Sequence, residues 1–212
     1  MAMDQDWRDG FFFLGNQLSL DFLNTLPDLG QAPHELLPDT VALLRWTVAA
    51  GITTSAQAKA LQKDWTKRNA TGLTRLHAFR EEWRKIVLGI EAGKASPRAF
   101  ITKLNGLLER YPMVDEVVRG EGFAVKPARH RRFEQRKPAD FFAPLADAVA
   151  TLLTAADYSR IRKCAKCGLH FYDTSKKGTR HWCSMRLCGN RYKVRAYYER
   201  KKSGDKPQSA NS

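Results

Sequence analysis

The residues with the clearest chemistry are four cysteines that lie close together in the C-terminal third of the chain. Cys164 and Cys167 are separated by two residues and Cys183 and Cys188 by four, with fifteen residues between the two pairs. In an intracellular chain, clustered cysteine pairs indicate metal binding, because a reducing compartment does not keep disulfides oxidised. A Cys-x-x-Cys turn directs two thiolates at one point, as zinc requires. The pattern predicts one structural Zn(2+) ion held by all four cysteines.

Two histidines leave a different ligand set open. His170 and His181 lie between the cysteine pairs, and either could replace a cysteine as a zinc ligand. A chain without metal is the remaining alternative. The wider spacing of the second pair predicts that Cys188 lies one helical turn beyond Cys183. Because four thiolates leave no position for a water molecule, we expect the zinc to be structural and not catalytic.

The segment between the two pairs must turn back on itself to bring the second pair beside the first. Residues 169–173 and 179–182 flank a polar turn, and this pattern predicts a hairpin of two short strands. Gly168 directly follows the first pair, where a metal-binding turn often needs a positive φ. A domain with so few core residues needs its metal, since a zinc-binding free energy on the order of 10 kcal/mol becomes folding free energy.

A strongly basic segment surrounds and follows these cysteines. Residues 151–212 hold 15 Lys and Arg against 4 Asp and Glu, whereas residues 1–150 hold 21 against 18, within a chain of net charge +14. Such asymmetry indicates an anionic polymer as partner, with a solubilising tail as the alternative. Residues 189–202 favour a helix that could enter the major groove of DNA. We expect nucleic acid, DNA in preference to RNA, to contact Arg180, Arg186, Asn190, Arg191, Lys193, Arg195, Arg200 and Lys201.

Two of these residues have a structural alternative that we slightly favour. Asn190 and Arg191 directly follow a predicted zinc ligand. They could therefore cap the basic helix or donate hydrogen bonds to a cysteine sulfur. For the whole basic helix, the alternative is an amphipathic element that docks on the N-terminal part of the chain.

The rest of the chain predicts a mainly helical unit, and its 43% hydrophobic content allows a packed core. Apolar spacing and capping residues indicate helices over residues 18–26, 39–50, 55–68, 73–91, 97–111 and 141–156. Residues 114–118 and 123–125 flank a Gly-rich turn and predict a β-hairpin, to which residues 130–135 could add a strand. The fold class is therefore mainly α with a small β-hairpin element, plus a C-terminal α+β, treble-clef-like zinc finger.

Two features of this helical unit suggest other functions. The helices over residues 39–68 have the pattern of a helix-turn-helix, although an ordinary helical hairpin has the same pattern and is favoured. Asp21, Asn24 and Thr25 share one face of the first helix and form a candidate small-ligand pocket, with structural hydrogen bonding as the favoured alternative. The sequence has no nucleophile–base pair, Gly-rich phosphate loop or open metal site, so we expect no enzyme activity.

Localisation follows from what the sequence lacks. No window approaches the roughly 18 consecutive apolar residues of a membrane span, so we expect no membrane partner. Three aspartates precede the first apolar run, which is the wrong polarity for a secretory signal. We therefore expect a cytoplasmic protein. A small-molecule effector and a homodimer stay open at this point.

Two stretches of sequence resemble known families. Residues 183–191, with Arg180-His181-Trp182 and Phe171-Tyr172-Asp173 before them, resemble the CGNR zinc finger of bacterial proteins, which is named after the string found here at Cys188 to Arg191. Residues 14–25 are similar to the opening motif of the ABATE domain, which commonly precedes this finger. The resemblance implies a zinc-dependent transcription regulator, often described as stress-induced.

The predicted elements and the resemblance together give a domain organisation. We expect a helical ABATE-like domain over residues 1–137, a linking helix over 138–160, a CGNR-type zinc finger over 161–202 and a disordered tail over 203–212. The leading hypothesis is a zinc-containing, DNA-binding transcription regulator whose N-terminal domain senses a ligand or mediates assembly. The alternative is an RNA- or ribosome-associated zinc-binding protein, since a basic helix with exposed tyrosines also suits single strands.

Overall fold

A computed structural model of the chain describes residues 6–27, 34–65, 70–121, 125–131 and 138–203. These residues form helices and three two-stranded antiparallel sheets, so the predicted fold class is confirmed. In chain order the elements are β1 (Trp7–Arg8), β2 (Phe11–Phe12), α1 (Leu18–Leu23), α2 (Thr40–Ala49), α3 (Ser55–Trp65), α4 (Ala70–Glu91), α5 (Arg98–Arg110), β3 (Met113–Arg119), β4 (Val125–Arg131), η1 (Pro138–Phe141), α6 (Phe142–Ala155), η2 (Tyr158–Arg160), β5 (Ile161–Lys163), β6 (His170–Tyr172), η3 (Met185–Gly189) and α7 (Asn190–Ser203).

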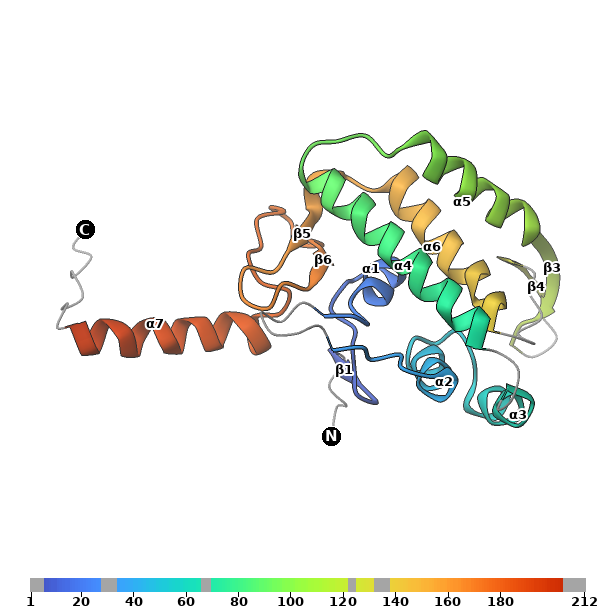
Figure 1. The fold of residues 1–212 in the computed structure, drawn as a ribbon, viewed down its shortest axis with the longest axis horizontal. Coiled ribbons are helices and arrows are strands. Elements are labelled where there is room, and N and C mark those ends of the chain that lie inside the picture. The colour runs from blue at the N-terminus through green and yellow to red at the C-terminus, as the bar shows by residue number, and fades with distance from the viewer. Residues whose placement is uncertain (1–5, 28–33, 66–69, 122–124, 132–137, 204–212) are drawn as a thin grey trace.

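The described residues between 6 and 160 form a helical body around one large core. Helices α4 and α6 run in the same direction, α5 runs back beside them in the opposite direction, and α1 packs against both α4 and α6 (Figure 1). The apolar face predicted for α4 is buried along its whole length, from Leu76 through Phe79 and Trp83 to Ile90. Helix α6 is buried in the same core and leads through η2 to β5.

A buried arginine that sequence reasoning missed stabilises this body. The Arg80 side chain on α4 is almost wholly buried and its guanidinium forms an ion pair with Glu35. Its Nη1 atom also donates a hydrogen bond of 2.8 Å to Thr25 Oγ1, which follows α1. A buried cation is tolerated only when paired and hydrogen-bonded, so these contacts tie α4 to the chain after α1.

The hairpin of the body differs from the prediction in its second strand. β3 pairs with β4 in register from Met113 opposite Arg131 to Arg119 opposite Val125. The second strand therefore occupies residues 125–131, and the predicted strand over 123–125 was too short. Because β4 already includes residues 130 and 131, they add no third strand, and residues 132–135 lie outside the described part of the chain.

The residues from 161 to 203, which we call the finger, hold a second and smaller core. This core consists of three of the cysteines with Leu169, Phe171 and, from the body, Leu14. Helix α7, the last element of the finger, projects away from the body (Figure 1). Of the tail expected over residues 203–212, Ser203 ends α7 and residues 204–212 lie outside the described chain.

The predicted hairpin of the finger is wrong in its pairing. β6 pairs with β5, Ile161 lying opposite Tyr172, and the first cysteine pair lies in the loop between them. Residues 179–182 form no strand, and this segment is held instead by a hydrogen bond of 3.0 Å from Ala165 N to His181 O. The strand before the first cysteine went unnoticed because it spans only three residues, two of them charged.

Candidate metal centre and nucleic-acid interface

The finger gathers its four cysteines into one cluster. Their Sγ atoms all lie within 4.8 Å of one another, and the Cys167–Cys183 and Cys183–Cys188 distances are 3.6 and 3.7 Å. A tetrahedral zinc ion with bonds of about 2.3 Å holds its sulfur ligands about 3.8 Å apart. The cluster therefore has the dimensions and the donor set of a structural zinc site. Among the residues that the structure describes, neither His170 nor His181 belongs to this metal-binding group.

Two tight turns aim the cysteine pairs at each other. After the first pair, Gly168 adopts the predicted positive φ of 72° and its N–H group donates to Cys164 O at 3.0 Å. Between the two cysteines of the second pair, the Ser184 side chain caps η3 by accepting a hydrogen bond from Leu187 N. The backbone N–H of Cys188 donates to Ser184 O at 2.9 Å, so Cys188 lies on the wide helical turn that leads into α7. The zinc site and α7 are thus continuous in structure.

The four thiols lie close enough together to shift one another's pKa values. Hydrogen bonds from Cys167 and Cys183 hold the pKa of the Cys164 thiol far below its usual range. A hydrogen bond between Cys167 and Cys164 raises the pKa of the Cys167 thiol to about 12. Contact with Cys164 likewise raises the pKa of Cys183, and burial raises that of Cys188. Without a metal the cluster favours a single thiolate, whereas a Zn(2+) ion stabilises all four.

Arg180, which we predicted to contact nucleic acid, is engaged inside the finger. Its Nη2 atom donates a hydrogen bond of 2.5 Å to the carbonyl oxygen of Cys183. Its guanidinium carbon also lies 5.2 Å from the ring centroid of the buried Phe171. These contacts give Arg180 a positioning role for the second cysteine pair.

Asp173 is a structural residue that sequence reasoning missed. It is fully buried, and its carboxylate accepts hydrogen bonds from the backbone N–H groups of Ser175 at 2.9 Å and Arg180 at 2.7 Å. Burial alone would raise its pKa, but these hydrogen bonds and the nearby Arg180 charge hold the pKa below its usual value. The signal available in the sequence was an Asp two residues before a Ser in a polar turn.

The start of the body binds the open edge of β6. The Asn24 side chain donates to His170 O at 2.8 Å and accepts from His170 N at 3.0 Å. Two residues along β6, Tyr172 N donates to Gly15 O at 2.8 Å and Tyr172 O accepts from Asn16 Nδ2 at 3.0 Å. We call these four hydrogen bonds the β6 clamp, because they hold the finger on the helical body.

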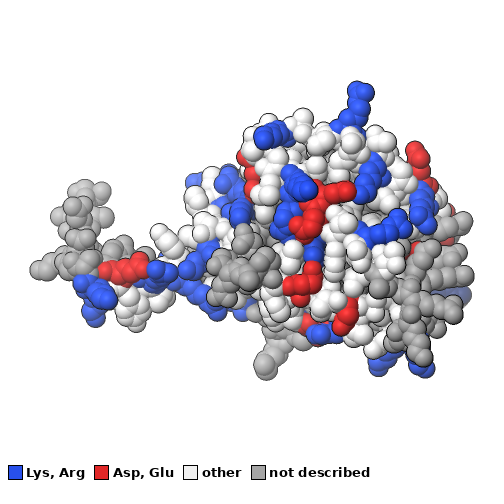
Figure 2. All heavy atoms as spheres, in the orientation of Figure 1, with Lys and Arg blue, Asp and Glu red and all other residues white. Residues whose placement is uncertain are grey.

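Helix α7 presents positive charge around its circumference. Residues 190–203 include six Lys and Arg and a single acidic residue, Glu199. Figure 2 shows Lys and Arg gathered over the finger and α7, whereas both signs are mixed over the body. Of the predicted contact residues, those with an exposed position on α7 are Asn190, Arg191, Lys193, Arg195 and Lys201. The placement of the Arg200 side chain lies outside the described part of the structure.

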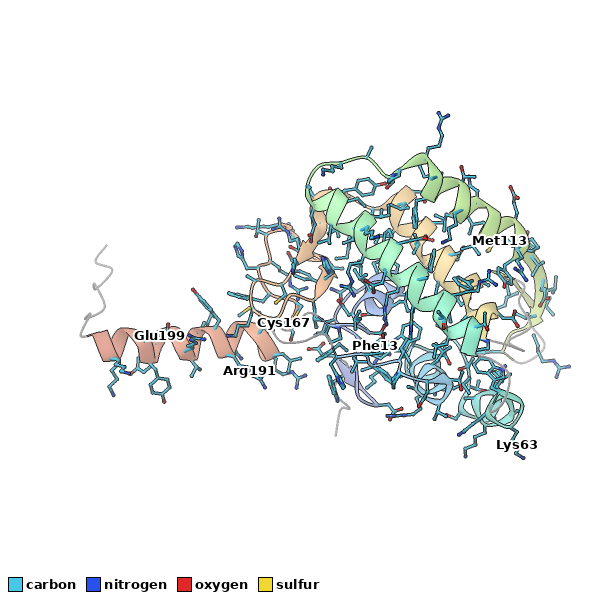
Figure 3. All side chains as sticks on the ribbon, viewed as in Figure 1. Phe13, Lys63, Met113, Cys167, Arg191 and Glu199 are labelled. Carbon is cyan, nitrogen blue, oxygen red and sulfur yellow. The ribbon has the colours of Figure 1, made fainter. Side chains whose placement is uncertain are left out.

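Several of these residues have partners within the protein. Arg195 Nε bonds Glu199 Oε1 at 2.6 Å along the exposed side of α7. The exposed Arg186 lies on η3, where its Nη2 atom is 3.7 Å from Asp6 Oδ2. Figure 3 places Arg191 at the base of α7, near Cys167, and Glu199 farther out along the helix. Ser184 caps η3, and Asn190 lies where η3 ends and α7 begins, so the capping role considered for Asn190 and Arg191 stays a prediction.

Comparison with protein families matches both parts of the chain. Residues 160–201 match the CGNR zinc finger. Residues 16–156, more than half of the 212 residues, match the ABATE family, described as "Putative stress-induced transcription regulator". The chain belongs to the ABATE family. Among curated proteins, none matches the chain. The four clustered cysteines within a CGNR zinc finger identify the cofactor as one zinc ion, and the family description is that of a transcription regulator and not of an enzyme.

Asp21, Asn24 and Thr25, which we predicted as one pocket, make different contacts in the ABATE domain. Asn24 forms part of the β6 clamp, and Thr25 bonds Phe22 O and Arg80. Asp21 lines a hollow of about 450 Å³ that Asn24 and Thr25 do not line, and its Oδ1 atom accepts from Gly15 N at 2.8 Å. A Cβ atom on Gly15 would lie 2.8 Å from Asp21 N, so only glycine fits beside this contact.

None of the helices in the described ranges combines the length and the apolar composition that a membrane span requires.

Asn24→Ala should loosen the finger from the ABATE domain. Asn24 is 2% exposed, and its loss leaves the His170 N–H and C=O groups without their partners. Two buried backbone groups left unpaired cost about 2–4 kcal/mol together. Urea unfolding should show this loss, and hydrogen exchange should become faster at β6. Asn105→Ala, on the exposed surface of α5, is the control and should change stability by no more than about 0.5 kcal/mol. Equal stability of the two variants would contradict the clamp.

Asp21→Asn should remove a pH dependence of stability. Burial raises the Asp21 pKa from 3.8 to about 7, outweighing the Gly15 hydrogen bond and the Arg8 charge. Between these values the unfolded chain has released a proton that the folded protein retains, so stability falls as the pH rises towards 7. Between about pH 5 and pH 8 this carboxyl should cost the wild type about 2–3 kcal/mol, a cost that the uncharged amide of the variant does not have. The difference between the two urea unfolding curves at each pH isolates this effect, and a pH-independent difference would contradict it.

Proposed function

We propose that this protein binds duplex DNA through α7 and the surrounding finger, and that it regulates transcription by doing so. The observation that carries the proposal is a cationic helix that continues directly from the zinc site and projects from the body. Membership of the ABATE family and the match to the CGNR zinc finger support the regulatory role.

The dimensions and charge of α7 suit the major groove. Its 14 residues give a length of about 21 Å, and an α-helix has the width that the groove admits. At about 100° per residue, Arg191 and Arg195 lie on one side of the helix and Lys193 on the other. Cations on opposite sides of a helix in the groove can reach the phosphates of both strands. Arg191 and Arg195 can also bond guanine edges in bidentate fashion.

The ABATE domain serves in this proposal to position the finger. The β6 clamp fixes the finger on the body, and zinc fixes η3 and hence the start of α7. A helix of this length is marginal alone in water, so its anchored base determines where it points. We propose that the chain divides as expected from its sequence, with α6 and η2 as the connection between the sensing or assembly domain and the finger.

One observation favours a second candidate, an RNA- or ribosome-associated protein. Tyr197 and Tyr198, near the middle of α7, are 56% and 64% exposed. Exposed aromatic rings beside cations can stack on unpaired bases. Tyr192, by contrast, packs with its ring centroid 4.7 Å from that of Trp182, within the finger.

Competition binding at two salt concentrations tests the proposal. Zinc-loaded protein is mixed with a labelled DNA duplex, and unlabelled duplex DNA or structured RNA is added as competitor. We expect duplex DNA to compete better, and affinity to fall steeply with added salt because phosphate contacts release counterions. Better competition by RNA would favour the alternative, and no binding at low salt would reject both.

A further inference from the structure

A second hollow lies where the C-terminal end of α4 meets the finger. It has a volume of about 440 Å³, enough for a small organic molecule. Buried Ile90 and Ile161 contribute apolar wall. The hollow therefore touches both the ABATE domain and β5, immediately before the first zinc ligand.

The charged residues around this hollow are mainly cations. Arg162, Lys163 and Arg180 line it together with one carboxylate, Glu91. Glu91 is also drawn toward the finger, since its Oε1 atom lies 3.3 Å from Nε2 of the buried His170. The guanidinium of Arg180 is already bonded to Cys183 O. The hollow is thus positive overall, and Arg162 and Lys163 are its two cations from β5.

Arg162 supplies an independent sign that a partner is missing. Its Nε atom is buried, and within the described part of the chain it has no hydrogen-bond acceptor. Buried donors are nearly always satisfied in folded proteins, and an unsatisfied one calls for a ligand, an ion or a water molecule. The planar guanidinium matches the geometry of a carboxylate or phosphate group.

We propose that this hollow binds a small organic oxyanion, with its carboxylate or phosphate group held by Arg162 and Lys163 and its carbon skeleton against Ile90 and Ile161. A ligand here would touch both α4 and β5, the strand that leads to Cys164. Its role as an effector of DNA binding rests on the proposed function. The bound anion would restrict the motion of the finger, and so of α7, relative to the ABATE domain.

Binding of succinate and of inorganic phosphate to the full-length, zinc-loaded protein tests the site. Both are titrated by calorimetry at constant ionic strength, so that general screening of α7 does not change. We expect saturable binding of at least one of them, weakened at least tenfold by Arg162→Gln and by Lys163→Gln. Arg119→Gln, on β3 of the body, is the matched control and should bind as the wild type does.

The outcomes separate this site from the proposed function. Absence of saturable binding by both anions, or equal binding by the wild type and by a folded Arg162→Gln or Lys163→Gln protein, overturns the site. Arg191→Gln should lower DNA affinity and leave anion binding unchanged. Anion binding in a protein that does not bind DNA would support the site and overturn only the proposed function.

Discussion

Cys183→Ser is expected to unfold the finger while the ABATE domain stays folded. The Cys183 Sγ atom lies within 3.7 Å of two other thiols of the zinc cluster, and half of the buried residues of the finger core are zinc ligands. Structural zinc contributes on the order of 10 kcal/mol to small domains, far more than this core could supply alone. The larger core of the body lies apart from the site and should survive. Bound zinc should fall well below one ion per chain.

Hydrogen exchange and metal analysis measure this result together. Amides of β5, β6 and η3 should lose their protection, whereas those of α4 and α6 should keep it. Ala165→Ser introduces the same residue at an exposed position between Cys164 and Cys167 and should change neither zinc content nor exchange. A protected finger in a Cys183→Ser protein that lacks zinc would show that the metal is not its main source of stability.

Removing three cations from α7 should weaken DNA binding on the order of 100-fold at low salt. The variant combines Arg191→Gln, Lys193→Gln and Lys201→Gln, all at exposed positions of α7. If each cation neutralises one phosphate of duplex DNA, the slope of log affinity against log salt should decrease in magnitude by about 2.7. Titrations of a labelled duplex at several salt concentrations measure both quantities.

The control removes the same charge from the ABATE domain. It combines Arg119→Gln, Lys59→Gln and Lys85→Gln, which are exposed on β3, α3 and α4. Loss of net charge alone would weaken both proteins equally, whereas a contact surface on α7 would make the first variant much weaker. Equal affinity and equal slopes would therefore contradict a DNA contact by α7.

The zinc site and the main helices were predictable because their signals are local in the sequence. Four thiols at metal-ligand spacing can meet only around one point, and the apolar residues of α4 recur at the period of a helix. The positive φ of Gly168 follows from the same local chemistry, and the structure has it. For these features, the backbone needs no information from distant parts of the chain.

The partners of polar residues were not predictable, because they depend on contacts between distant segments. Helical spacing put Asp21, Asn24 and Thr25 on one face, but it could not show that Asn24 bonds His170, which lies 146 residues away. The burial of Arg80 has the same cause, since Glu35 and Thr25 reach it only in the folded body. The sequence did not predict the pairing of β5 with β6 for a related reason, because a three-residue strand has too few side chains to show a pattern.

Duplex-DNA affinity before and after removal of zinc tests the central claim most directly. A fluorescently labelled duplex is titrated with the full-length protein as purified, after chelation, and after zinc is added back. Because one zinc ion fixes the base of α7, we predict that chelation abolishes tight binding and that zinc restores it. DNA binding that is equally tight in the zinc-free protein would contradict the account.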